Sequence, residues 1–329
     1  MTADNRSFVT FPYAGMALDP IHVGTGGTRL GRVDNTIVRD PVTKIPKIPG
    51  SSMAGVLRAY TAMKLENDKP GRKFGGKDKP YFPNCAGQGG GDSGHCGDAD
   101  CPVCAVFGFA KGTGASGGFA GLAAFSDGHV LLFPVATREG PLWVTCPSTL
   151  RLIGELREFP EMKEDAIYRE QDAKNPLNLG WLMLPVKVNP NGWPDYSRAI
   201  DSLGVPEYIT ARIGVVSDKL FTHVVNSNLE VRTSVAIDPA TGAAKEGALF
   251  SYEALPRGTV IVWEVTCRNP AHFRINDGSV VAVTTPAAVR DVVTSAHAYL
   301  EHLGIGGMGS RGMGRLRVLG TVRVAGEGK

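Results

Sequence analysis

The chain has 329 residues, enough for one large domain or two ordinary ones, and its 43% hydrophobic and 20% charged content is ordinary for a soluble protein. With 35 basic and 32 acidic residues the net charge is only +3, so a surface that binds a polyanion has to be local. No apolar run reaches the ~20 residues of a membrane helix, and the N-terminus has no signal-peptide pattern. We therefore expect a cytoplasmic protein.

The first part of the chain reads as a strand followed by a glycine-rich turn. Apolar and aromatic residues recur through residues 7–23, which predicts a strand region. The turn at residues 22–31 (HVGTGGTRLG) lacks the Gly-Lys-Ser/Thr ending of a nucleotide phosphate-binding loop. By residue type alone, His22 is more typical of a packed or capping histidine than of a catalyst.

Residues 31–58 predict a proline-punctuated loop that leads into an amphipathic helix. Three prolines exclude helix or central strand from residues 40–50, and Gly50-Ser51-Ser52 supplies a turn and a serine helix cap. A free helix N-terminus favours an anion, and this one is accompanied by basic residues and two acids on the same loop: Arg39, Lys44, Lys47, Arg58, Asp34 and Asp40. A basic cradle with isolated carboxylates suits a phosphodiester. A plain connection between a strand and a core helix is the alternative.

A cysteine cluster follows a polar, glycine-rich stretch at residues 67–94, which we expect to be a surface excursion with little core. Cys85, Cys96, Cys101 and Cys104 are spaced C-x10-C-x4-C-x2-C. Four thiolates fill a tetrahedral zinc site and leave no open position, so the ion would be structural. Four unrelated thiols, or His95 in place of Cys85, are the alternatives. The other two cysteines, at 146 and 267, are expected to be buried.

Strand patterns dominate the centre of the chain. The run DGHVLLFPV at residues 127–135 predicts a central strand, and residues 151–213 predict mixed structure. Two β-prone runs, 229–237 and 247–255, flank DPATGAAKEG and predict a long hairpin. Asp218 and Glu253 are single acids for which capping or ion-pair roles are the alternatives to catalysis.

The C-terminal part predicts a strand, a helix and a glycine-rich loop. The strand is expected at residues 260–267, and a helix opens at Pro286 and ends at Gly304. The loop GIGGMGSRGMGRLRV then carries Arg311, Arg315 and Arg317, and its glycines allow backbone amides to approach phosphates. Because the loop follows a helix and precedes a strand, it does not fit a dinucleotide-binding turn, and single-stranded RNA suits it better.

Three spaced motifs, HVGTGG (22–27), VDN-x-IVRDP-x-T (33–43) and IPGSSMAGVLR (48–58), resemble the N-terminal signature of RAMP-superfamily backbone subunits of type III CRISPR effector complexes. The resemblance continues through DCPVCAVFG, FPV, LWVTCP, VVSD-x-LF, LFSYEALP and the glycine-rich end. The later motifs are most similar to those of the Cmr-type subunit, whereas the sequence of the second motif, at residues 33–43, is also similar to that of the Csm-type subunit.

The resemblance implies an α+β fold with a ferredoxin-like (RRM-like) core in a single RAMP-type domain, residues 1–329. It implies an insertion at about residues 67–118 and a thumb hairpin at about residues 222–255. In the family this hairpin wedges into the guide–target duplex and displaces a base pair. Val231, Val235 and Ile237 would then supply its apolar contacts, although a plain sheet hairpin fits the same pattern.

The family also implies an activity, a metal-dependent endoribonuclease. Asp34 matches the catalytic aspartate, which acts beside Mg²⁺ or Mn²⁺ while a ribose 2′-hydroxyl attacks the adjacent phosphate and leaves a 2′,3′-cyclic phosphate. His22 and Glu253 are further candidates. The expected partners are CRISPR guide RNA, target single-stranded RNA, copies of the chain itself and other effector subunits.

The expected RNA contacts lie in the two cradles: Arg39, Lys44, Lys47, Ser51, Ser52 and Arg58 in the first, and Gly306, Gly307, Gly309, Ser310, Arg311 and Arg315 in the second. One departure is Ala54, where the family usually carries a lysine, so a phosphate contact is either missing or supplied by Arg58 or Lys47. A non-cleaving subunit that only assembles along the guide is the alternative function. A zinc-stapled RNA-binding protein outside CRISPR systems is a third hypothesis.

Overall fold

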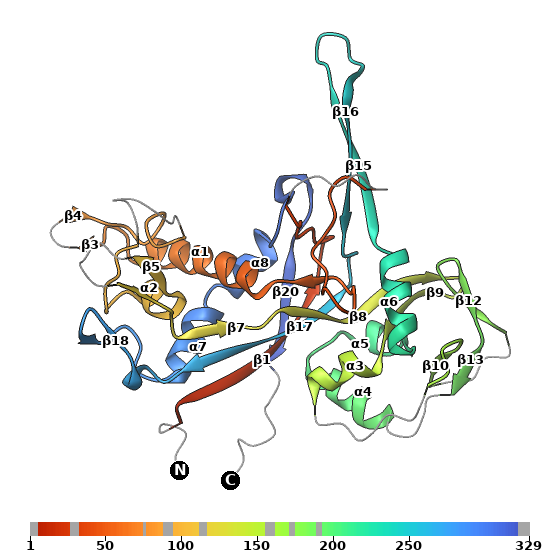
Figure 1. Ribbon diagram of the computed structural model, residues 1–329, viewed down its shortest axis with the longest axis horizontal. Helices are drawn as coiled ribbons and strands as arrows, with labels where there is room; N and C mark the ends of the chain where they lie inside the picture. Colours follow the sequence, from red (N-terminus) through yellow and green to blue (C-terminus); the bar gives the residue numbers. More distant parts are fainter. Residues whose placement is uncertain are drawn as a thin grey trace.

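A large mixed β-sheet forms the centre of the protein, whose structure is a computed structural model that describes residues 6–26, 33–74, 77–87, 95–111, 117–154, 162–170, 175–188 and 193–321 (Figure 1). Within these residues the sheet has the order β13-β10-β14-β9-β8-β17-β1-β20, with β2 beside β8 and β7 beside β17. The pairs β9–β14 and β10–β13 are parallel and the others are antiparallel. The strands are β1 (Phe8–Ala17), β2 (Lys47–Ile48), β7 (Ala123–Phe125), β8 (Gly128–Thr137), β9 (Gly140–Thr145), β10 (Ile167–Arg169), β13 (Val186–Val188), β14 (Ile213–Val215), β17 (Val260–Arg268) and β20 (Leu316–Thr321).

Alternating side chains give the central strands two buried faces. In β1, Tyr13 and Ala17 enter one apolar core, whereas Ala14 and Met16 enter the other. This period of two follows from the pleat, which points successive side chains to opposite sides of the sheet. Helices α1 (Gly50–Asp68), α7 (Pro286–Thr294) and α8 (His297–His302) supply residues to the first core, and α3 (Pro147–Leu150), α4 (Trp193–Ser202) and α5 (Glu207–Thr210) supply residues to the second.

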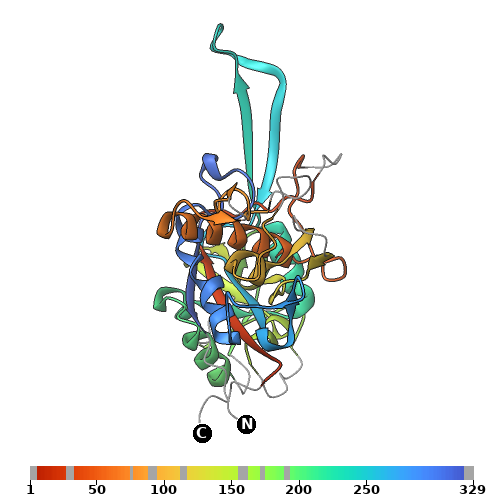
Figure 2. The same cartoon turned by 90° about the vertical axis from the view of Figure 1, so that its left-hand side faces the viewer.

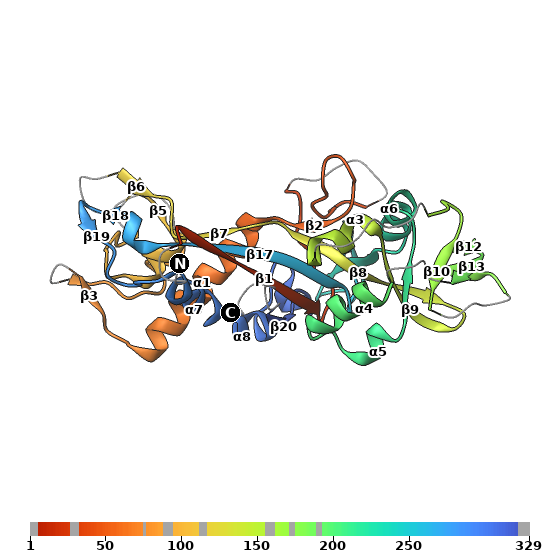
Figure 3. The same cartoon turned by 90° about the horizontal axis from the view of Figure 1, so that it is seen from below.

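The two ends of the elongated body are built differently (Figure 3). One end holds the cysteine segment with helix α2 (Pro102–Phe107) and the short hairpins β3–β4 (Lys73–Phe74 and Lys77–Asp78), β5–β6 (Phe109–Lys111 and Gly117–Phe119) and β18–β19 (Arg274–Ile275 and Gly278–Ser279). The other end holds strands β9, β10 and β13, the hairpin β11–β12 (Leu177–Leu179 and Leu182–Leu184) and helix α6 (Asp218–Ser227).

A two-stranded hairpin projects from the middle of the body (Figures 1 and 2). Its strands β15 (Glu230–Ile237) and β16 (Ala244–Ala254) are antiparallel, with an irregularity near Val235. The side chains of Val231, Val235, Ile237 and Leu249 are exposed by 41–68%. We call this hairpin the thumb. The thumb therefore presents apolar side chains to its surroundings, and its contacts with the rest of the protein are made at its base.

Most of the expected elements are present, with different limits. The predicted central strand at 127–135 and the strand at 260–267 correspond to β8 and β17, and the fold is α+β as expected. The thumb begins at Glu230, because residues 222–227 belong to helix α6. The helix predicted from Pro286 to Gly304 is two helices, which meet at residues 295–296.

Two further expectations concern the excursion and the membrane. The excursion at residues 67–94 has little core as expected, since Cys85 is the one buried residue among those whose burial the structure describes there, and the buried apolar residues near the cysteines, Val103, Ala105 and Val106, come from α2. None of the helices in the described part of the chain combines the length and the hydrophobicity needed to cross a bilayer.

Candidate nucleic-acid interface

Asp34 is tied to the base of the thumb. Its carboxylate oxygen Oδ2 accepts hydrogen bonds from the backbone N–H of Ser251 at 2.8 Å and from the Ser251 hydroxyl at 2.9 Å. These bonds, the backbone one first, hold the pKa of the carboxyl below its usual range, because they favour the charged form. Asp34 is thus an ionised and partly exposed carboxylate at neutral pH, and it is fixed to strand β16.

The next residues of the loop pair with the same strand. Asn35 forms a parallel bridge with Tyr252, in which its N–H donates to the carbonyl oxygen of Ser251 at 3.1 Å and its carbonyl accepts from the N–H of Glu253 at 3.0 Å. The chain around Asp34 is therefore registered against the thumb by main-chain hydrogen bonds.

Glu253 and Arg39 form an ion pair beside Asp34. The Arg39 guanidinium donates to Glu253 Oε2 at 2.8 Å and to the side-chain oxygen of Asn226 in α6 at 2.9 Å. Their side chains are only 23% and 14% exposed. Glu253 Oε2 also faces the N–H of Ile37 at 3.4 Å. Both side chains are thus engaged within the protein, and the pair fastens the loop to the thumb and to α6.

His22 lies beneath this arrangement and is 6% exposed. Its Nδ1 lies 2.6 Å from the carbonyl oxygen of Glu253, a contact in which the ring nitrogen donates. The His22 carbonyl accepts from the N–H of Gly307 at 2.8 Å, and the ring meets Tyr252 edge-on. The structure therefore places His22 as a packed link between the glycine-rich loop and the thumb, and it gives little access for direct catalysis.

The glycine-rich loop at 304–315 packs against the thumb base. Gly306 has φ +87°, and a Cβ there would come within 2.3 Å of the His22 carbonyl oxygen, so only glycine permits the approach. Met308 and Met313 pack with Phe250 and Tyr252 of β16, and the Arg311 guanidinium lies 5.4 Å from the centre of the Phe250 ring. Gly307, Gly309, Ser310 and Arg311 are exposed.

Contacts join the two predicted cradles into one region. Helix α1 reaches the second cradle through Tyr60, whose hydroxyl donates to the Gly304 carbonyl at 2.6 Å and whose ring stacks on Tyr299. The loop before α1 reaches it through Arg39, Glu253 and His22. Residues 44–58 and 304–317 therefore lie in neighbouring parts of the same region, beside the thumb (Figure 1).

The start of α1 is not a free anion site. The expected serine cap is wrong, because the N-cap residue is Pro49 and no side chain of that residue caps the helix. Instead Asp127 accepts from the N–H of Gly50 at 2.8 Å and from Lys47 Nζ at 2.6 Å. Its carboxylate occupies the place where a phosphate was expected, and the Lys47 bond lowers the pKa of that carboxyl. Ser51 is exposed and Ser52 is half-buried on the same turn.

The expectation that Arg58 contacts RNA is wrong. Arg58 is 9% exposed and points into the protein, where Nε donates to the Cys85 carbonyl at 2.7 Å and NH2 donates to His95 Nδ1 at 2.7 Å. It cannot replace a lysine missing at Ala54. Helical periodicity placed this arginine on α1 but could not show which buried neighbour it faces.

Other predicted basic contacts already have acidic partners. Arg315 pairs with Asp19, and Arg317 pairs with Glu301 at 2.9 Å. Lys44 lies at an exposed turn in the left-handed region, with φ +61°. In the described ranges, Lys44 and Arg311 are the members of the predicted set of basic side chains that have neither an acidic partner nor a buried position.

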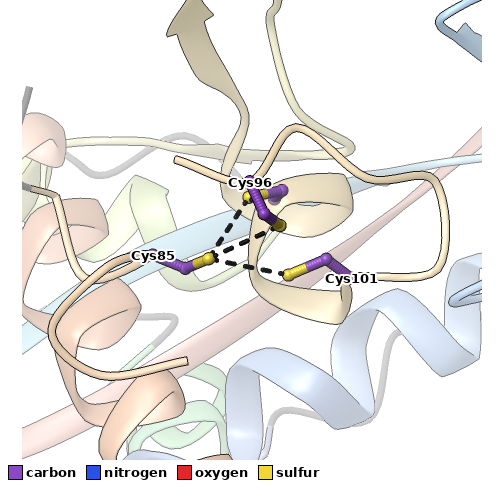
Figure 4. A group of neighbouring side chains, drawn as sticks. Cys85, Cys96 and Cys101 are labelled. Atoms are coloured by element: carbon purple, nitrogen blue, oxygen red, sulfur yellow. Dashed lines mark hydrogen bonds between the residues drawn. The ribbon is translucent and has the colours of Figure 1, made fainter. Parts of the chain in front are cut away.

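The four cysteines form one buried cluster (Figure 4). Their four Sγ atoms lie within 4.8 Å of one another, and the closest pairs are separated by 3.5–3.9 Å. Sulfurs bound tetrahedrally at ~2.3 Å from zinc would be ~3.8 Å apart, so the residues present fit such an ion. His95 faces Arg58, and its Nδ1 accepts the Arg58 bond, so the ligand set that the geometry supports is the four thiols.

Three residues of this region had no signal in the sequence analysis: Ser251, Asp127 and Asn226. Ser251 lies in LFSYEALP, a segment whose sequence signals are the family resemblance and a β-prone pattern, and Asp127 directly precedes an apolar run that predicts a strand. Each acts on a partner far away in the sequence, so only the fold pairs them. An Asp in a turn directly before a strand is a common signal, and it does not indicate which helix the carboxylate caps.

Comparison with known proteins places this fold and site in a class. The chain belongs to the RAMP superfamily, which it matches over residues 16–317. It is similar to the CRISPR system Cmr endoribonuclease Cmr4 of Pyrococcus furiosus, with 26% identity over 261 residues, 74% of this chain and 76% of that protein. It is also 31% identical to the Cms endoribonuclease Csm3 of Methanothermobacter thermautotrophicus, over 100 residues, 30% of this chain and 32% of that protein.

Solved structures of low sequence identity share the fold. The type III-B Cmr-β complex bound to cognate target RNA contains a chain with a TM-score of 0.60 and 16% identity, covering 96% of this chain and 99% of that one. Oligomeric Cmr4 from P. furiosus also gives 0.60, with 21% identity and coverage of 96% and 100%. The resemblance to type III backbone subunits, most like the Cmr type, is confirmed. The match to Csm3 covers a smaller part of the chain.

Proposed function

We propose that the protein is a backbone subunit of a type III CRISPR effector complex, which binds guide RNA and cleaves the target RNA paired with it. Its relatives are named endoribonucleases, and one similar structure is a complex bound to target RNA. The observation that carries the proposal is the position of Asp34: an ionised carboxylate held by Ser251 at the base of an apolar thumb, whose neighbouring residues Phe250 and Tyr252 pack against the glycine-rich loop. The partners would be guide RNA, single-stranded target RNA, further copies of the chain and other effector subunits.

The central strands support the proposal that the core is ferredoxin-like. In chain order the elements are β1, α1, β8, β17, the pair α7 and α8, and β20, which is the β-α-β-β-α-β sequence of that fold. In the sheet the four strands lie in the order β8-β17-β1-β20, each antiparallel to its neighbour.

The RNA-binding surface in this proposal differs from the expected one at the level of single residues. Lys44 and Arg311 supply exposed positive charge, and the amides of the glycine-rich loop approach phosphates closely. Arg39, Lys47 and Arg315 would bind phosphate only by exchanging their present acidic partners.

The proposed cleavage uses the target strand's own nucleophile. The 2′-hydroxyl gives its proton to solvent as its oxygen attacks the adjacent phosphorus, the bond to the 5′-oxygen breaks, and that oxygen takes up a proton from solvent, which leaves a 2′,3′-cyclic phosphate and a 5′-hydroxyl. A carboxyl with a lowered pKa is a weak base, so the role of Asp34 is electrostatic and orienting. A bound Mg²⁺ or Mn²⁺, held by Asp34, would stabilise the charge that develops on the phosphate.

Glu253 and His22 do not act as the base in this proposal. The Glu253 carboxylate is paired with Arg39, and His22 is buried and bonded to the carbonyl of Glu253. Both hold the thumb, the loop and the glycine-rich segment together around Asp34.

We further propose that Cys85, Cys96, Cys101 and Cys104 hold a structural zinc ion. The sulfur–sulfur distances support this, as do two guanidinium groups near the cluster, which would offset the net negative charge of a zinc tetrathiolate. The Arg58 guanidinium donates to the carbonyl of Cys85, and the Arg72 guanidinium is hydrogen-bonded to Cys96. The ion would order the segment before α2.

The test of cleavage is the substitution Asp34→Ala in the guide-loaded complex. We expect cleavage of a complementary target RNA to be lost while target affinity stays the same. Asp40→Asn is the matched control, because Asp40 lies on the same loop and an asparagine keeps its cap on Thr43. If Asp34→Ala cleaves at the wild-type rate, the alternative of a non-cleaving subunit that assembles along the guide is favoured.

A further inference from the structure

Among the residues that the structure describes, the thumb strand supplies every hydrogen bond that another residue donates to the Asp34 carboxylate. Both donors are groups of Ser251, its backbone N–H at 2.8 Å and its hydroxyl at 2.9 Å, and both reach the same oxygen, Oδ2. The hydroxyl also accepts from the N–H of Asp34 at 3.2 Å. Hydrogen bonds to an ionised group are stronger than neutral ones, and two donors on one oxygen leave the carboxylate few orientations.

No hydrogen bond from another described residue reaches the second carboxylate oxygen, Oδ1, while the backbone N–H of Asp34 itself also favours the ionised carboxyl. Oδ1 is therefore the oxygen available to a substrate or a hydrated cation. Because Oδ2 is fixed by Ser251, the direction in which Oδ1 points depends on the position of strand β16 as well as on the loop that carries Asp34. The next residue of the loop, Asn35, forms a parallel bridge with the next residue of the strand, Tyr252, so the pairing of the loop with β16 continues by one residue.

The apolar face of the thumb continues into this contact. Cross-strand pairing places Val235 opposite Leu249 and Thr233 opposite Ser251, and paired residues project to the same face of a hairpin. Ser251 thus lies on the face that also carries the exposed Val235 and Leu249, two residues further toward the base, at a spacing of roughly 7 Å along the strand.

We infer that Ser251 is the positioning residue of the cleavage site, and that it aims the Asp34 carboxylate according to the position of the thumb. An RNA duplex that contacts Val235 and Leu249 would act on the strand that holds Asp34. This inference rests on the proposed function, because it gives Ser251 a role only if Asp34 takes part in cleavage.

Three variants in the guide-loaded complex test it. Ser251→Ala removes the hydroxyl bond and keeps the backbone bond. Ser251→Thr keeps the hydroxyl on a side chain that suits a strand. Ser234→Ala is the control, since Ser234 lies in the same hairpin and its hydroxyl meets Tyr252 instead of Asp34. Single-turnover cleavage of a complementary target RNA, target affinity and the thermal midpoint are measured for each.

We expect Ser251→Ala to slow cleavage about tenfold, the effect of losing roughly one hydrogen bond that orients a reacting group, with target affinity within about twofold of wild type. Ser251→Thr should cleave within about threefold of wild type, and Ser234→Ala should be unchanged. Similar thermal midpoints would exclude misfolding as the cause.

Other results overturn the inference. Wild-type cleavage by Ser251→Ala, together with lost cleavage in Asp34→Ala, would remove the positioning role and leave the proposed function intact. Equal losses in rate and affinity, or a threonine variant as slow as the alanine variant, would also remove it. Normal cleavage by Asp34→Ala would overturn the proposed function itself, and the role of Ser251 with it.

Discussion

Replacing one cysteine of the cluster tests the zinc proposal most directly. Cys104 is fully buried at the first turn of α2, and its Sγ lies 3.5 Å from that of Cys96 and 3.8 Å from that of Cys85. Structural zinc sites contribute ~10–16 kcal/mol of apparent binding free energy, so one ligand of four accounts for about 3 kcal/mol. We therefore expect Cys104→Ser to bind zinc more weakly by about that amount, so that the purified variant holds less zinc and is about 3 kcal/mol less stable.

The expected shift in melting temperature follows from the size of the chain. Unfolding entropy is ~2.1 cal/mol/K per residue, which for 329 residues is about 0.7 kcal/mol/K, so a loss of about 3 kcal/mol lowers the melting temperature by about 4 °C. Zinc content measured by atomic emission and melting followed by circular dichroism check both values, with a chelator added to wild-type protein in parallel.

Cys146→Ser is the matched control for this prediction. Cys146 is also buried, but its sulfur faces the hydroxyls of Ser148 at 3.3 Å and Thr149 at 3.6 Å, outside the cluster. A hydroxyl is tolerated there, so this variant should keep its zinc. Wild-type protein purified without zinc, or a Cys104→Ser variant with full zinc content and an unchanged melting temperature, would refute the reasoning.

Three other predictions address charge, pH and the thumb. Lys44→Ala and Arg311→Ala should each reduce the slope of log affinity for single-stranded RNA against log salt by ~0.7, whereas Arg317→Ala, which removes a charge already paired with Glu301, should change it less. Burial lowers the pKa of His297 to about 4, so the imidazole binds a proton more readily in the unfolded chain. The free energy of unfolding should therefore be highest above pH 6.5 and fall by at most roughly 3 kcal/mol as the pH drops toward 4. Urea unfolding of His297→Phe should lack this pH dependence. Val235→Ser should leave the melting temperature unchanged, since the side chain is 41% exposed, and lower the rate of target cleavage; equal rates would argue against thumb contact.

The parts of the fold that were predictable are those with local patterns. The continuous apolar run of β8 is typical of a strand buried on both faces, and the first run of the thumb has the period of two of a strand with one apolar face. The cysteine spacing predicted a cluster because a C-x2-C pair keeps two thiols close whatever the rest of the chain does. In the last helical region, the break at residues 295–296 was missed because Ser295 and Ala296 do not interrupt the apolar periodicity.

The site was predictable only as a set of candidate residues. Asp34 and the glycine-rich loop were identified by resemblance, but their partners depend on pairings across more than 200 residues of chain, such as Asp34 with Ser251. The sequence showed that Arg58 and Lys47 are charged. It did not show that the Arg58 side chain points into the protein, or that the Asp127 carboxylate pairs with Lys47. The partner of a side chain depends on how the whole chain packs, and the spacing of neighbouring residues in the sequence does not identify it.

The internal partners of the basic residues have an electrostatic consequence for the free protein. Lys47, Arg39 and Arg315 are each neutralised by a carboxylate, so a phosphate must displace an anion that is already in place. Such an exchange releases less free energy than filling an empty site. Under the proposed function, a short nucleic acid that reaches one such position would gain little, whereas an extended strand that makes several exchanges together would gain more, so the affinity for RNA should rise with strand length.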